Sequence, residues 1–60
     1  MADKNMTVRE YAESRDFEVV GKLTYLGVDR GSKVWVDEAG NEYSKSKRGF
    51  CIIDTEGAVY

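Results

Sequence analysis

The sequence predicts a single α+β domain, residues 1–60, in which one short N-terminal helix packs on a curled antiparallel sheet of about five strands. Three observations support this fold class: one helix-start signal near the N-terminus, a high content of β-branched and aromatic residues from residue 17 onward, and two D-x-x-G turn patterns. The connections between the predicted strands are too short for parallel crossovers, so the sheet must be antiparallel. Its form is either an open meander or a small, partly open barrel.

The helix is predicted over about residues 8–15. Thr7 can cap its first turn, and Glu10 three positions later completes a capping box. Asp16 suits the left-handed backbone that often ends a helix. The apolar stripe has i, i+3, i+4 spacing and consists of Val8, Tyr11 and Ala12. Because two helical turns are not stable alone in water, the stripe must pack on the sheet. Residues 1–6 precede the helix and are expected to be frayed.

The first strand is predicted over residues 17–26, at the centre of the sheet. The turns at 37–40 and 54–57 share one chemistry, in which the leading aspartate bonds its own backbone and the final glycine adopts a left-handed conformation. This turn geometry places Trp35 opposite Tyr43 on the following strand. The predicted core consists of Val8, Tyr11, Ala12, Phe17, Val19, Leu23, Tyr25, Val36, Ile52 and Ile53.

Composition argues against several activities. The chain has no histidine, which is the commonest general base and the commonest zinc ligand. Its single cysteine, Cys51, cannot form an intramolecular disulfide or a thiolate metal cage, and its apolar strand favours an inert thiol. We therefore predict that the protein is not an enzyme and uses no metal or cofactor. Because the N-terminus lacks an apolar signal region and no apolar run is long enough to span a bilayer, a cytoplasmic protein without a membrane partner is expected.

The most suggestive stretch for binding is basic and ends on an aromatic residue. Lys45, Lys47 and Arg48 can bind phosphates, and Phe50 can stack on a base. The competing interpretation is a solvated loop whose charges discourage edge-to-edge association. Nine basic and eleven acidic residues give a net charge of −2, without the basic surface typical of nucleic-acid binders. This balance favours the solvated loop.

Trp35 and Tyr43 form the second candidate site. They are either an exposed aromatic platform for a partner or part of the core. The polar pairing of Val34 and Val36 with Ser44 and Glu42 favours the core. By elimination, we expect a small non-catalytic module that acts through a protein partner or through self-association, in an accessory or regulatory role. The alternative function is weak nucleic-acid binding through Lys45, Lys47, Arg48 and Phe50, although nucleic acid is the less expected partner.

Three segments carry a resemblance: TVREYAES at residues 7–14, FEVVGKLT at 17–24 and VWVDEAGNEY at 34–43. Together they resemble short uncharacterised bacterial proteins found in commensal genomes and mobile elements. The resemblance covers roughly residues 7–57. It implies a bacterial, cytoplasmic protein, and it transfers no activity and no residue role.

Overall fold

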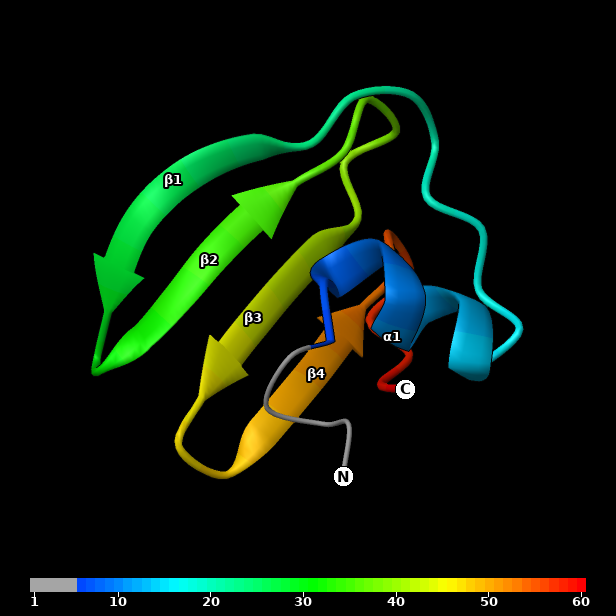
Figure 1. Cartoon of the computed structure of the whole chain (residues 1–60). Helices are drawn as coiled ribbons and strands as arrows, with labels where there is room; N and C mark the ends of the chain where they lie inside the picture. Colours follow the sequence, from blue (N-terminus) through cyan, green and yellow to red (C-terminus); the bar gives the residue numbers. More distant parts are fainter. Residues whose placement is uncertain (1–5) are drawn as a thin grey trace.

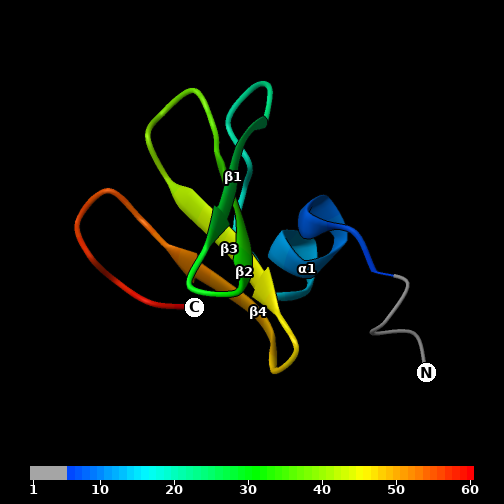
Figure 2. The ribbon, with the colours of Figure 1, turned by 90° about the vertical axis from the view of Figure 1, so that its left-hand side faces the viewer.

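The computed structural model describes residues 6–60 and consists of one helix packed on one face of one sheet (Figures 1 and 2). The elements in chain order are α1 (Val8–Ser14), β1 (Thr24–Asp29), β2 (Ser32–Val36), β3 (Glu42–Ser46) and β4 (Gly49–Ile53). The strands pair antiparallel in the order β1-β2-β3-β4, which is a simple meander. The predicted α+β class with an antiparallel meander is confirmed. Of the residues expected to be frayed, 1–5 lie outside the described part of the chain.

The sheet is smaller and flatter than the sequence predicts. It has four strands rather than five, and it is open, with β1 and β4 at opposite edges. The predicted central strand at 17–26 is wrong, because regular pairing begins only at Thr24 and β1 is an edge strand. The chain turns at Gly21, where φ is 70°, and the backbone on either side of it bonds to the β2–β3 turn instead of to a strand. The C-terminal segment pairs with β4 only locally, through an Ile53–Val59 bridge.

The helix follows its local signals. The Thr7 hydroxyl accepts a hydrogen bond from the Glu10 N–H at 3.1 Å, and the Glu10 carboxylate accepts one from the Thr7 N–H at 2.9 Å. This is the predicted capping box. Asp16 follows the helix with φ 57°, the left-handed conformation predicted for it. The helix start and stop are therefore encoded within about ten neighbouring residues.

Both D-x-x-G turns have the predicted geometry. Gly40 and Gly57 have φ angles of 98° and 88°, in the left-handed region. The Asp54 carboxylate accepts two backbone hydrogen bonds from its own turn, at 2.9 and 2.8 Å. The predicted pairing of Trp35 with Tyr43 is present in the β2–β3 register. These turns set the register that decides which side chains share a face.

A buried carboxylate, Asp37, ties the β2–β3 turn to the rest of the fold. Its two oxygens accept five hydrogen bonds, from the N–H groups of Val20, Ala39 and Asn41, the Asn41 amide and the Tyr43 hydroxyl, at 2.7–3.1 Å. Burial alone would raise the pKa of Asp37, but these hydrogen bonds hold that pKa well below its usual range. Burial, with the hydrogen bond to Asp37 and its charge, raises the pKa of Tyr43 above its usual value.

The core lies between α1 and the face of the sheet that carries Tyr43. Its buried apolar members are Val8, Ala12, Tyr43 and Ile52. Around them pack the partly buried side chains of Tyr11, Phe17, Val19, Leu23, Trp35 and Phe50. The predicted core positions Tyr25 and Ile53 are wrong, since these side chains are 51% and 40% exposed. Tyr25 lies on the edge strand, and Ile53, like the half-buried Val36, belongs to the face opposite α1.

Candidate functional site

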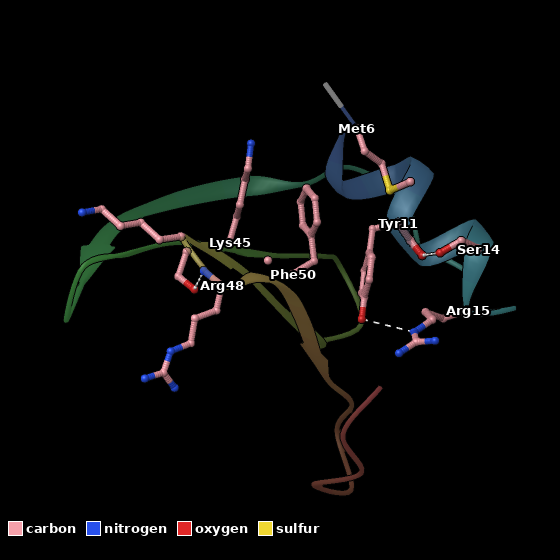
Figure 3. Close-up of a pocket in the computed structure, with 10 residues that line it drawn as sticks. Met6, Tyr11, Ser14, Arg15, Lys45, Arg48 and Phe50 are labelled. Atoms are coloured by element: carbon pink, nitrogen blue, oxygen red, sulfur yellow. Dashed lines mark hydrogen bonds between the residues drawn. The ribbon is translucent and has the colours of Figure 1, made fainter. Parts of the chain in front are cut away.

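A groove runs between α1 and the β3–β4 hairpin, and we call it the hairpin groove (Figure 3). Its volume is about 560 Å³. It is lined by Met6, Tyr11, Ser14, Arg15, Lys45, Ser46, Lys47, Arg48, Gly49 and Phe50. The groove therefore contains all four residues of the predicted basic site.

An aromatic pair with cations at its two ends lies in this groove. The rings of Tyr11 and Phe50 stack with centroids 5.0 Å apart and an angle of 19° between their planes. The Lys45 ammonium lies 5.4 Å from the centre of the Phe50 ring, and Figure 3 shows these two side chains next to each other. At the other end, the Arg15 Nε donates a hydrogen bond to the Tyr11 hydroxyl at 3.2 Å. The row Lys45–Phe50–Tyr11–Arg15 joins β3, β4 and the helix.

The local structure explains how each member of the row is placed. Lys45 and Phe50 are direct partners in the β3–β4 register, so their side chains share a face. Tyr11 is in the middle of α1 and Arg15 is its C-cap four residues later, a spacing that places both on one side of the helix. Lys47 and Arg48 form the two-residue turn between β3 and β4, and both are exposed. Figure 3 shows the Arg48 side chain pointing away from Phe50, so it lies at the rim of the groove.

A second groove, which we call the sheet groove, adjoins the first. Its volume is about 460 Å³, and it is lined by Met6, Thr7, Val8, Arg9, Leu23, Lys33, Trp35, Lys45 and Phe50. The two grooves share Met6, Lys45 and Phe50. Within the sheet groove, Lys33 lies directly opposite Lys45 across β2 and β3. Like charges in such cross-strand positions repel each other.

Positive charge is concentrated along these two grooves. Six of the nine lysine and arginine residues of the chain line one or both of them: Arg9, Arg15, Lys33, Lys45, Lys47 and Arg48. Among the residues that the structure describes, no aspartate or glutamate lines either groove. A chain with a net charge of −2 thus has most of its basic residues along two adjoining grooves.

The structure extends the predicted site and corrects part of it. Sequence reasoning named the basic residues of the hairpin but missed Tyr11, Arg15 and Lys33. The sequence contains a signal for each. Tyr11 and Arg15 have the i, i+4 spacing that places two side chains on one side of a helix. The predicted pairing of Trp35 with Tyr43, continued two residues away from the turn, places Lys33 opposite Lys45. Of the two alternatives for Tyr43, the core is correct and the exposed platform is excluded, because its side chain is 1% exposed. Trp35 is half-buried and lines the sheet groove.

The described residues 6–60 give no observation that points to a metal site or to a membrane-spanning helix. They contain no group of three histidine, cysteine, aspartate or glutamate side chains placed to hold a metal ion. Within the same residues, no helix is long and apolar enough to cross a membrane. Comparison of the chain with protein-family models, with curated proteins and with solved structures finds no match.

Proposed function

We propose that the protein is a non-catalytic binding module for single-stranded nucleic acid, which lies along the hairpin groove and continues into the sheet groove. One observation carries the proposal: six cations line the two grooves together with the partly exposed rings of Tyr11, Trp35 and Phe50, and no described carboxylate lines either groove. Proteins that bind single strands combine a cationic groove for the backbone with aromatic rings for the bases.

The aromatic rings favour a single strand over a duplex, because only unpaired bases can stack on them. The Lys45 ammonium covers Phe50 in the free protein. An exposed cation–π contact contributes about 0.5–1 kcal/mol, whereas stacking of a base on an aromatic side chain contributes about 1–3 kcal/mol. A base therefore replaces the ammonium at Phe50 at a net gain, and Lys45 becomes free to contact the adjacent phosphate.

The negative net charge does not prevent binding. Electrostatic interactions between exposed charges are largely screened beyond about 8 Å at physiological ionic strength. The molecule measures 29 × 25 × 20 Å, so carboxylates on its far side contribute little at the grooves. They do weaken long-range attraction, and we expect dissociation constants in the micromolar range rather than below it.

The test is a fluorescence-anisotropy titration of a labelled eight-nucleotide oligothymidylate at 50 and 200 mM salt. If the four cations of the hairpin groove contact phosphates, the slope of log K against log salt is about −2.8, and the affinity falls roughly 50-fold between the two salt concentrations. The triple variant Lys45→Ala, Lys47→Ala, Arg48→Ala should lose most of the binding and still fold. As a control, Lys22→Ala with Arg30→Ala removes two cations that line neither groove and should bind almost normally. Equal binding by the triple variant and the control would contradict the proposal.

Self-association is a second candidate function, favoured by the free edge of β1. No described strand pairs with its outer side, and it exposes Tyr25, Leu26 and Val28 by 51%, 58% and 65%. Unprotected edges of this kind pair readily with other strands. Sedimentation equilibrium should detect a dimer that Leu26→Lys converts to monomer. A wild-type protein that stays monomeric at millimolar concentration would exclude this function.

A further inference from the structure

We infer that Lys33 and Lys45 together form a phosphate-binding site at the junction of the two grooves, and that the bound unit is one dinucleotide step with a base on either side of this phosphate. The identity of the ligand rests on the proposed function. The phosphate site itself rests on a separate observation, the juxtaposition of two lysines on neighbouring strands.

The cross-strand neighbours of the lysine pair carry no negative charge. Lys33 and Lys45 are direct cross-strand partners on the face that α1 covers in part. Val28 on β1 pairs with Lys33, and Phe50 on β4 pairs with Lys45, so both flanking partners are apolar. No described acidic residue lines the groove between them. Such an arrangement lowers the stability of the free protein, and a bound anion removes the repulsion.

Two aromatic rings lie next to this phosphate position. Phe50 is the direct partner of Lys45 on β4, and Trp35 follows Lys33 by two residues on the same face of β2. Trp35 lines the sheet groove, and on one side it contacts Tyr25, with ring centroids 5.5 Å apart. A phosphodiester held by the two lysines therefore has one base directed toward Phe50 and the next toward Trp35. Trp35 is the only tryptophan of the chain, so its fluorescence reports this second base.

Lys33→Glu separates this site from a general charge effect, because it changes stability and binding in opposite directions. In the free protein it replaces a repulsive pair with an attractive one, so the midpoint of urea unfolding should rise. The affinity for labelled oligothymidylate should fall about tenfold or more, the size of a lost charge-assisted contact. The quenching of Trp35 by the oligonucleotide should also disappear. The matched control is Arg30→Glu, which has the same charge change outside both grooves and should show neither the rise in midpoint nor the full loss of affinity.

The outcomes distinguish this inference from the proposed function. If the wild type binds the oligonucleotide and Lys33→Glu binds it equally well, the phosphate site is wrong while the proposed function stands. If the wild type does not bind, the proposed function fails, and tripolyphosphate then tests the site alone. A rise in the unfolding midpoint with tripolyphosphate in the wild type but not in Lys33→Glu would support a site for free polyphosphate. The same response in both proteins, or in neither, would overturn it.

Discussion

At the scale of single residues, the Asp37 carboxylate shows how this small protein stabilises a buried charge. An ionised carboxylate that loses water is costly unless its oxygens are fully hydrogen-bonded. Asp37 is 5% exposed and accepts five hydrogen bonds, which come from its own turn, from Val20 and from the Tyr43 side chain. Because Tyr43 is also a core residue, the same contact joins the apolar core to the polar turn.

Tyr43→Phe tests the contribution of this contact. The variant keeps the ring in the core and removes only the hydroxyl that donates to Asp37 at 2.7 Å. A hydrogen bond to a charged group contributes about 1.5–3 kcal/mol, so the free energy of unfolding at pH 7 should fall by this amount. The control is Tyr25→Phe, whose ring is 51% exposed and whose change should be close to zero. Equal effects of the two substitutions in urea denaturation would contradict the role given to Asp37.

The same pair predicts how stability depends on pH. The pKa of Asp37 is lowered by folding, so its contribution is complete above its usual pKa of about 3.9 and is lost as the pH falls below that value. The pKa of Tyr43 is raised, so its contribution is complete below about pH 10 and is lost as the pH rises further. Unfolding free energies measured from pH 3 to 11 should therefore fall at both ends. Above pH 10, the unfolding free energy of Tyr43→Phe should decrease less than that of Tyr25→Phe. An equal decrease in the two variants would exclude Tyr43 as the source of the alkaline effect.

At the scale of elements, the D-x-x-G turns set the register of the sheet. Gly40 has φ 98°, which a residue with a β-branched side chain adopts only under strain. Gly40→Val should lower the unfolding free energy by more than about 1 kcal/mol. Ala39→Val, at an exposed neighbouring position without positive φ, is the control and should have little effect. A silent Gly40→Val in thermal unfolding would show that the turn does not require this conformation.

The helix depends on its contact with the β3–β4 hairpin. Tyr11 stacks on Phe50 and donates a hydrogen bond from its hydroxyl to the Tyr60 carbonyl at 3.2 Å. Tyr11→Ala removes both contacts and should cost about 3 kcal/mol, which is a large share of the stability of so small a domain. Glu13→Ala, on the exposed side of the helix, should be nearly neutral. Helix content by circular dichroism should fall with Tyr11→Ala alone, and retention of the helix in that variant would show that α1 does not need the hairpin.

Features with local causes could be predicted from the sequence, and features with distant causes could not. The capping box and the two turns each depend on residues within four positions, and all of them are present. The strand predicted at 17–26 fails because the backbone around Gly21 bonds to the side chains of Asp37 and Glu38, sixteen or seventeen residues away. The burial of Tyr43 depends on the same distant structure. At the candidate site, the basic hairpin and the spacing of Tyr11 and Arg15 are visible in the sequence, whereas the stacking of Tyr11 on Phe50 depends on how the helix packs on the sheet.

At the scale of the whole molecule, the two faces of the sheet differ in chemistry. One face carries α1, the core and the cationic grooves. Figure 2 shows the helix on this side of the sheet. The opposite face carries Val36 and Ile53 and has no covering layer among the described residues. If a nucleic acid binds in the grooves, the surroundings of side chains on the α1 face should change on binding, and those of side chains on the opposite face should not.

Nuclear magnetic resonance of the protein titrated with oligothymidylate tests this central claim most directly. We expect the methyl signals of Met6 and Leu23 and the indole N–H of Trp35 to shift in a saturable manner, because these groups line the grooves. The methyl signals of Val36 and Ile53, on the opposite face, should remain unchanged. Shifts confined to the opposite face or to β1, or no saturable shift at 50 mM salt, would contradict the proposal that the cationic grooves bind a single strand.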